Sequence, residues 1–277
     1  MALIKPVVYS GILREKFLGK VRVAKLAREI GEIDGFRQVG EKILFPKFKT
    51  ISAAEELTKG NSFTPVELDQ DSSEATIKMV GKSINVYDIE DMTALGEKLD
   101  EGADQISTVV ARKFDDDLIA EAKTSPMKSA TAGASAITGD ELNAGFQLFG
   151  DEQDFDTFAG IVVNSLLVPS IMKIDGFTDA TKTTTMLGNG IIQDGCIGSY
   201  RAVPIYISDK GTFDTTLSEC VSLIIKKGAL GYKTKRNFKS EEARDINKQM
   251  TTINGNHVYA VKLLADDGIV VLRKTIA

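Results

Sequence analysis

The sequence predicts an α+β fold in which strands lie on both sides of one long helix along the chain. Apolar residues alternate with polar ones over residues 74–80, which is the period of a half-buried strand. An apolar stripe with steps of three and four runs from Met92 to Leu118, which is the period of a helix. The remaining short strands and helices follow one another with no repeating βαβ order and no internal repeat.

Two segments in the first third of the chain predict a β-ribbon joined by a polar stretch. Residues 40–50 read as a strand, and Pro46 places it at a sheet edge or a bulge because proline lacks the N–H donor. The alternation over residues 74–80 changes phase at Gly81, which predicts a bulge or turn there. A two-stranded ribbon is marginal in water, so we expect this one to need a partner surface.

A single helix is predicted over residues 90–123, with Asp91 as its N-terminal cap. Its expected length is about 50 Å at 1.5 Å per residue. Two shorter segments, 6–18 and 21–33, also have helical spacing and are expected to lie on another surface. The apolar stripe of the long helix consists of Met92, Leu95, Leu99, Ala103, Ile106, Val110, Phe114 and Leu118.

Beyond this helix, residues 124–139 are rich in serine, threonine, alanine and glycine and are predicted to be a linker. A helix is expected over residues 140–150, followed by a short helix interrupted at Pro169. The Asn-Gly pair at 254–255 and the Asp-Gly pair at 267–268 are typical of hairpin turns and predict three C-terminal strands. Buried strands are predicted over residues 158–165, 201–208 and 220–227.

The composition is that of an ordinary globular protein. The 277 residues are 43% hydrophobic and 26% charged, with a net charge of -5 and a mean hydropathy of -0.05. This mild acidity provides no general basic surface for nucleic acid. No apolar run approaches the roughly 20 residues of a membrane span, and the N-terminal stretch lacks a signal-peptide pattern. Cys196 and Cys220 are the only cysteines, so a reduced, intracellular setting is expected.

Few residues predict chemistry. His257 is the only histidine, and with two separated cysteines it cannot complete a convincing metal cluster, so a structural role is expected. A serine triad would need His257, yet the chain has no G-x-S-x-G turn. The glycines of residues 187–195 lack the spacing of a phosphate loop. Asp115, Asp116 and Asp117 lack EF-hand spacing and are predicted to lie on a solvated or partner-facing helix side. No catalytic, cofactor or metal site is expected.

Two blocks of opposite charge follow each other near the C-terminus. Three interpretations remain open: two solvated surfaces, complementary contacts between neighbouring copies of the chain, or binding of nucleic acid. The adjacent acidic residues and the net charge weaken the third interpretation. The blocks contain Lys226, Lys227, Lys233, Lys235, Arg236 and Lys239, followed by Glu241, Glu242 and Asp245.

The order of these segments resembles the major capsid proteins of tailed bacteriophages, which have the Hong Kong 97-like fold. GEKILFPKF, ATIKMVGKSINVYDIEDM and ARKFDDDLIAEA follow the family's order of arm, strand and long helix. GIVVNSLLVPSIMK and GCIGSYRAVPIYISD resemble the family's later strands and helix, although the family often has glycine where Ala202 stands. The C-terminal region also agrees, and the resemblance extends from about residue 5 to residue 275.

The resemblance implies an N-terminal arm, an extended loop that crosses a neighbouring subunit, a spine helix in a peripheral domain, and an axial domain. The implied ranges are 1–40 for the arm and the start of the peripheral domain, 41–89 for the loop (a β-arm), 90–127 for the spine helix, 128–234 for the axial domain and 235–277 for C-terminal strands shared by both domains. The expected contacts between copies are Phe45, Phe48, Phe63, Ile77, Lys233, Lys235, Arg236, Glu241, Glu242 and Asp245.

The function that the resemblance implies is structural and not enzymatic. Copies would form pentamers and hexamers of an icosahedral shell around double-stranded DNA, without sequence-specific contacts. A separate scaffolding protein, a portal, assembly in the host bacterial cytoplasm and a final place in the virion are also implied, with no cofactor and no membrane. Two alternatives remain: an encapsulin-like compartment shell, which the long 41–89 arm argues against, and a small-molecule hydrolase or binding protein, for which the sequence offers no convergent polar cluster.

Overall fold

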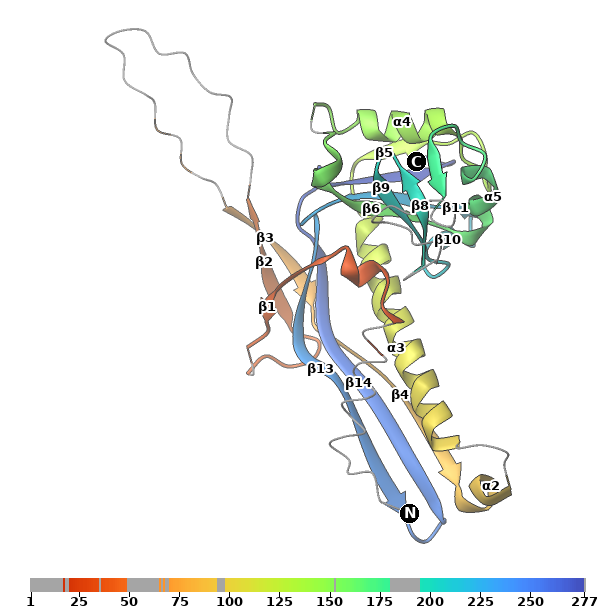
Figure 1. The fold of residues 1–277 in the computed structure, drawn as a ribbon. Helices are drawn as coiled ribbons and strands as arrows, with labels where there is room; N and C mark the ends of the chain where they lie inside the picture. Colours follow the sequence, from red (N-terminus) through yellow and green to blue (C-terminus); the bar gives the residue numbers. More distant parts are fainter. Residues whose placement is uncertain are drawn as a thin grey trace.

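The computed structural model describes residues 17, 20–34, 36–48, 65, 67, 70–93, 98–151, 153–179 and 195–276. It contains a four-stranded sheet in the order β1-β13-β14-β4 and a seven-stranded sheet in the order β5-β15-β12-β6-β9-β8-β7 (Figure 1). Two further sheets, β2-β3 and β10-β11, have two strands each. This mixture of helices and mainly antiparallel sheets confirms the α+β class. In the described part of the chain, no helix is both long and apolar enough to cross a membrane.

The four-stranded sheet, here called the long sheet, is built on an antiparallel hairpin whose turn spans residues 246–249. We call the end at this turn the far end, because it lies opposite the seven-stranded sheet in Figure 1. At about 3.3 Å per residue, the longest strand extends roughly 50 Å. The strands are β1 (Arg28–Glu32), β13 (Leu230–Asp245), β14 (Met250–Leu263) and β4 (Lys78–Tyr87), with β1 parallel to β13 and the other pairs antiparallel.

The prediction of a hairpin turn at Asn254 and Gly255 is wrong. Both residues lie inside β14, paired with β13 on one side and β4 on the other. A Cβ atom at Gly255 would lie 2.6 Å from Ile106 and 2.7 Å from Phe238, so the glycine permits close packing of helix and sheet. The turn at residues 267–268 is confirmed, but it joins β14 to a strand of the other sheet.

The bulge or turn predicted at Gly81 is also wrong. Gly81 lies within β4, in continuous register with Asn256 of β14. A Cβ atom at Gly81 would lie 2.9 Å from the carbonyl oxygen of Gly255, which again explains the glycine by crowding. The interruption lies instead at Ile77, between β3 and β4.

The strand predicted over residues 40–50 is confirmed as β2 (Lys42–Phe48), which pairs with β3 (Gln70–Thr76). Pro46 therefore belongs to a two-stranded sheet and stands at an edge, as predicted. The segment 41–89 contains two parts with different partners, since β2 and β3 pair with each other whereas β4 belongs to the long sheet. We call β2, β3 and Ile77 the arm root.

Residues 21–33 do not form the predicted helix. They form a 3-10 turn, η1 (Val23–Lys25), and then β1. Gly31 has a φ of 105°, which is incompatible with a right-handed helix and is accessible to glycine. Of the helix predicted over residues 6–18, only Phe17 lies within the described residues, and it is helical and buried.

Within the single helix predicted over residues 90–123, the structure describes α2 (Asp88–Thr93) and α3 (Lys98–Ala122), and residues 94–97 lie outside the described residues. The cap predicted at Asp91 is wrong because α2 begins three residues earlier. Met92 is exposed on α2, and the side chains of Leu95 and Leu99 lie outside the described residues. The rest of the stripe is confirmed as the buried face of α3: Ala103, Ile106, Val110, Phe114 and Leu118.

The three consecutive aspartates of α3 do not form a solvated face, which corrects the prediction. Asp115 and Asp117 are buried, and Asp116 alone remains partly exposed. Asp117 accepts a 2.8 Å hydrogen bond from the Tyr259 hydroxyl and forms a 3.1 Å ion pair with Lys113. Such donors are needed because an unpaired buried charge is costly.

The segment predicted to be a linker is packed instead. Part of it forms β5, which pairs in parallel with β15, and Ser125 is buried with its hydroxyl donating to the carbonyl of Ile269 at 2.5 Å. The helices and strands predicted after it are confirmed within a few residues. The elements are β5 (Lys128–Ala130), α4 (Gly139–Gln147), η2 (Phe155–Thr157), β6 (Phe158–Val163), η3 (Ser165–Leu167), α5 (Val168–Ile171), β7 (Phe177–Asp179), β8 (Cys196–Tyr200), β9 (Val203–Ile207), β10 (Phe213–Asp214), β11 (Glu219–Cys220), β12 (Ser222–Lys226) and β15 (Ile269–Arg273).

The turn between β8 and β9 is strained. Arg201 and Ala202 have φ values of 51° and 66°, the left-handed region that non-glycine residues occupy at a cost. We expect Ala202→Gly to raise the free energy of unfolding by about 1 kcal/mol, measured by urea denaturation. Ala243→Gly, at an exposed position inside β13, should instead lower it, and equal effects at both sites would contradict this account.

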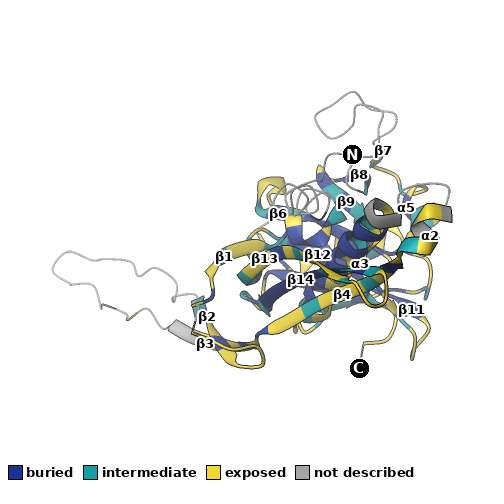
Figure 2. Cartoon of the chain, turned by 90° about the horizontal axis from the view of Figure 1, so that it is seen from below, coloured by how far each residue is buried: buried dark blue, intermediate teal, exposed yellow. Residues whose placement is uncertain are grey.

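Three hydrophobic clusters hold the molecule together (Figure 2). The largest joins α3 to both sheets, so Leu118 of α3, Leu223 of β12 and Tyr259 of β14 share one core. The second fills the opposite face of the seven-stranded sheet beneath α4 and α5. The third is small and lies at the arm root. Cys196 and Cys220 are both buried, and neither belongs to a disulfide.

Candidate assembly surfaces

The arm root has a core of its own. Ile43 and Phe45 of β2, with Ala75 and Ile77, pack against the long sheet at Val258, Ala260 and Ile33. Phe45 is 0% exposed and Ile77 1% exposed. Burying a side chain of this size stabilises by about 1.5–3 kcal/mol, so the root is firmly seated.

This packing corrects the reason for expecting Phe45 and Ile77 at a contact between copies. Both were expected there because the arm seemed to lack a core, but their side chains are already covered by their own chain. Leu44, on the other face of β2, is 56% exposed. The side chain of Phe48 and all of Phe63 lie outside the described residues.

Polar contacts also attach the arm root to the body. The Lys233 ammonium donates to the carbonyl of Leu44 at 3.2 Å and lies 5.1 Å from the centre of the Phe45 ring. Lys47 forms an ion pair with Asp266 beyond the end of β14. Lys233, a predicted contact between copies, is therefore engaged within the chain.

The two charge blocks lie along β13 except for Lys226 and Lys227, which lie at the end of β12 and in the following turn, and part of the charge on β13 is paired internally. Arg236 donates to Asn256, Lys239 pairs with Glu241, and Asp245 lies 3.9 Å from Lys248. The hydrogen bond from Lys239 holds the pKa of Glu241 below its ordinary value. Of the predicted contact residues on β13, Lys235 and Glu242 form neither an ion pair nor a side-chain hydrogen bond within the described part of the chain.

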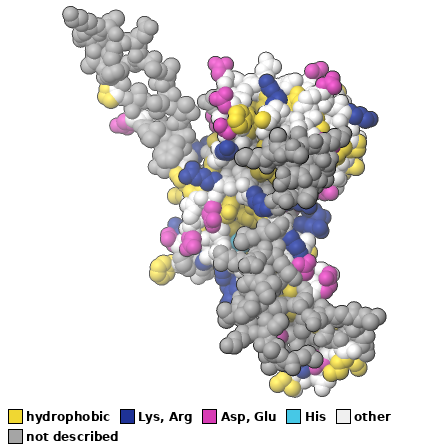
Figure 3. Space-filling view, viewed as in Figure 1, with side chains coloured by type: hydrophobic (Ala, Val, Ile, Leu, Met, Phe, Trp, Pro, Cys, Tyr) yellow, Lys and Arg dark blue, Asp and Glu magenta, His cyan; other side chains and the backbone are white. Residues whose placement is uncertain are grey.

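The far end of the long sheet carries an apolar surface that the sequence analysis missed. The Arg244 guanidinium pairs with both carboxylate oxygens of Asp88, at 2.6 and 3.1 Å, and so attaches α2 to β13. Hydrophobic atoms gather at this end in Figure 3. The sequence analysis assigns Met92 to a buried stripe. The one sequence signal for an apolar surface here is an isolated isoleucine at 246 in a polar turn. The surface consists of Tyr87, Ile89, Met92 and Ile246, which are 42%, 74%, 85% and 80% exposed.

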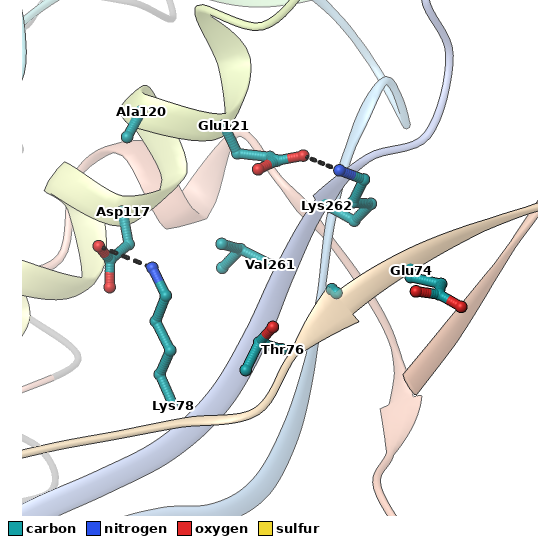
Figure 4. Close-up of a pocket in the computed structure, with 9 residues that line it drawn as sticks. Glu74, Thr76, Lys78, Asp117, Ala120, Glu121, Val261 and Lys262 are labelled. Atoms are coloured by element: carbon teal, nitrogen blue, oxygen red, sulfur yellow. Dashed lines mark ion pairs between the residues drawn. The ribbon is translucent and has the colours of Figure 1, made fainter. Parts of the chain in front are cut away.

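A pocket of about 280 Å³ separates the arm root from α3 (Figure 4). Lys78 of β4 lies 3.3 Å from Asp117, and Lys262 of β14 lies 2.6 Å from Glu121. Burial opposes ionisation of Asp117, but the hydrogen bonds from Tyr259 and the nearby lysines hold its pKa below the ordinary value. Four of the lining charges thus form two ion pairs between α3 and the long sheet, whereas Glu74 pairs with Lys42 outside the pocket.

His257 has the structural role that was predicted. Its Nδ1 lies 3.1 Å from the carbonyl of Arg236, to which it donates, and its ring lies 5.0–5.2 Å from those of Phe17, Phe114 and Tyr259. Burial lowers its pKa to about 4. Among the residues that the structure describes, no three histidine, cysteine or acidic side chains are placed to hold a metal ion.

Asp115 anchors the N-terminal segment to α3, a role that no local sequence signal indicates. Its carboxylate accepts hydrogen bonds from the backbone N–H groups of Arg22, Val23 and Ala24 at 2.9, 3.1 and 3.0 Å. Burial raises its pKa to about 6, against the opposing effect of these donors.

These two groups predict opposite pH dependences of stability. His257 has a lowered folded-state pKa, so its contribution is present above pH 6.5 and is lost as the pH falls toward 4. Asp115 has a raised folded-state pKa, so stability increases as the pH falls through 6 toward 3.8. Between pH 7 and pH 5 we expect a loss of about 2 kcal/mol from His257 and a gain of about 1.4 kcal/mol from Asp115.

Urea unfolding of two variants at pH 7 and pH 5 separates these contributions. The His257→Gln chain should gain stability between pH 7 and pH 5, because it keeps only the contribution of Asp115. The Asp115→Asn chain should lose more stability over the same interval than the unmodified chain does. Identical pH dependence in all three chains would refute both assignments.

Solved structures from phages share this architecture. The chain resembles one titled Mycobacterium phage Che8, with a TM-score of 0.63 and 16% identity over 92% of this chain and 91% of that one. It resembles a chain from the capsid structure of cyanophage P-SCSP1u equally well, with a TM-score of 0.63 and 15% identity over 93% and 89%. These likenesses confirm the Hong Kong 97-like fold.

The family described as phage capsid protein matches residues 70–272, and the chain belongs to this family. The chain is also 25% identical to the major capsid protein of Staphylococcus phage phiMR11, over 97% of this chain and 93% of that protein. An encapsulin from Synechococcus elongatus is a further structural neighbour, with a TM-score of 0.56 and 13% identity over 75% of this chain and 78% of that one.

Proposed function

We propose that this protein is the major capsid protein of a tailed phage and assembles as pentamers and hexamers into an icosahedral shell around double-stranded DNA. The observation that carries the proposal is the likeness to a major capsid protein over 97% of the chain. In this proposal the long sheet and α3 belong to the peripheral domain, and the seven-stranded sheet belongs to the axial domain at the ring centres. Assembly occurs in the host bacterial cytoplasm with a separate scaffolding protein and portal. The protein acts structurally in the virion and not as an enzyme.

Size measurement tests this proposal directly. The chain is expressed alone and with a scaffold candidate, and the products are measured by light scattering and negative-stain microscopy. Shells, tubes or discrete pentamers and hexamers are expected. A persistent monomer at high concentration under both conditions would overturn the proposal.

A second candidate function is a compartment shell that encloses an enzyme instead of DNA. The encapsulin likeness supports it, although that likeness covers less of the chain than the phage structures do. The contents of purified particles distinguish the two functions. A phage shell holds DNA in infected cells, whereas a compartment holds one protein cargo in stoichiometric amount.

Two charged residues of β13, half-buried Lys235 and exposed Glu242, supply candidate contacts between copies. Lys235 and Glu242 have opposite signs and form no ion pair within the described residues, and we propose that they meet across copies. Lys235→Glu or Glu242→Lys alone should slow assembly, because like charges then face each other. The double variant should recover most of the rate, measured by light scattering at low salt. Single variants with unchanged rates and salt dependence would exclude this pair.

A further inference from the structure

One turn of α3 has a weakened backbone. The Ser107 hydroxyl donates to the carbonyl oxygen of Asp104 at 2.8 Å, and the Thr108 hydroxyl donates to the same oxygen at 2.7 Å. Side chains that compete for helix carbonyls in this way loosen the helical ladder and often bend it. Gly102, a poor helix former, lies two residues before this turn, where a Cβ would overlap Ile84 at 2.0 Å. We call residues 104–108 the soft turn.

The two halves of α3 differ in support. Beyond the soft turn, Leu118, Ile119 and Ala122 are completely buried in the core that includes both sheets. At and before it, Ala103 and Ile106 belong to the same core, but the strands that the described residues place beside α3 there belong to the long sheet, with Ile84 beside Gly102 and Gly255 beside Ile106. A bend at the soft turn would therefore change the angle between the far end and the seven-stranded sheet, and it would leave in place the contacts that Leu118, Ile119 and Ala122 make beyond the turn.

A segment from the N-terminal part of the chain crosses this turn. The Lys20 ammonium donates to the carbonyl oxygen of Asp104 at 3.2 Å and to the Thr108 hydroxyl at 2.7 Å, and it pairs with the Asp104 carboxylate. A single side chain thus holds both ends of the soft turn. The Lys20 ammonium and its partners are only partly exposed, so this contact is less screened than a surface pair.

The same segment is anchored firmly further along. Its backbone N–H groups at residues 22–24 bind the buried Asp115 carboxylate, 11 residues or about 16 Å beyond Asp104 along the helix. The Arg22 guanidinium also donates to the carbonyl of Ile207 in the seven-stranded sheet at 3.0 Å. The segment is therefore fixed to the rigid half of the molecule and reaches back to the soft half.

We propose that residues 20–24 are a splint that holds α3 straight at the soft turn, with Lys20 as the positioning residue. Release of Lys20 lets the soft turn open and frees the angle between the far end and the seven-stranded sheet. The consequence for assembly rests on the proposed function: a shell of uniform size needs one such angle, so loss of the splint yields shells of mixed curvature.

The test compares Lys20→Met with Lys173→Met, which removes the same charge at an exposed site of the seven-stranded-sheet region. Amide hydrogen exchange is measured on each chain before assembly. Lys20→Met should speed exchange over residues 105–112 by about tenfold, the equivalent of one lost charged hydrogen bond, with residues 116–122 unchanged. Equal exchange in both variants would overturn the splint.

A second variant keeps the test decisive if Lys20→Met destabilises the whole chain. Ser107→Ala with Thr108→Val removes the competing hydroxyls and should restore protection in the Lys20→Met background. A failure of this rescue would show that Lys20 only contributes general stability, which also overturns the proposal. Shell size distributions of the same chains are read separately. If neither the variants nor the unmodified chain form particles, the proposed function is wrong. The hydrogen-exchange data still test the splint in that case.

Discussion

Trimming the arm should raise the concentration needed for shell formation and leave the fold intact. Phe48 and Gln70 are paired opposite each other at the end of the described ribbon, so residues 49–69 can be replaced by Asn-Gly, which closes a two-residue hairpin. The arm root keeps its own core in this variant, and the circular dichroism spectrum and melting temperature should change little. If the arm crosses a neighbouring subunit, as the proposed function implies, each trimmed copy loses contacts with its neighbour. A loss of about 2 kcal/mol per contact raises the threshold concentration for assembly by about 30-fold.

Light scattering across a concentration series measures this threshold. Leu44→Ala is the control, because it alters an exposed residue of the same ribbon and leaves the arm complete. Trimmed chains that assemble at the original threshold into particles of the original size would show that the arm does not connect copies.

Phe45→Ala should detach the arm root from the long sheet. Phe45 is completely buried, and truncation of a buried phenylalanine costs about 3–5 kcal/mol. The Lys233 ammonium also loses the ring on which it lies. We expect faster hydrogen exchange throughout β2 and β3 and a lower urea midpoint in the unassembled chain.

Leu44→Ala again provides the matched control, since Leu44 is the adjacent residue on the exposed face of β2. It should leave exchange and unfolding nearly unchanged. The comparison also separates the two roles considered for Phe45. If Phe45→Ala impaired assembly but left the unassembled chain as stable as before, then Phe45 would be a contact between copies and not part of the root core.

Local periodicity predicted much of the fold correctly. The buried stripe from Ala103 to Leu118 and the strand at 42–48 were identified because neighbouring positions along a helix or strand share one environment. The order of such elements along the chain was enough to indicate the capsid family. These features depend on residues close together in sequence.

The errors share a physical cause. Asn-Gly at 254–255 is compatible with a turn, yet the glycine is required by the approach of Ile106 and Phe238. Aspartate is usually found at the surface, yet the Asp115 carboxylate accepts three backbone hydrogen bonds from a segment more than 90 residues away. In both cases a distant segment determines the environment.

The sequence alone determined the α+β class, the long amphipathic helix and the capsid family, because each depends on local pattern or on segment order. Only the tertiary structure decided where the apolar face of the arm root packs, which charges on β13 remain unpaired, and that Lys20 holds the soft turn of α3. Lys20 and Asp104 are 84 residues apart, and no periodicity links them. Burial and pairing of this kind arise only when the chain has folded and brought such residues together.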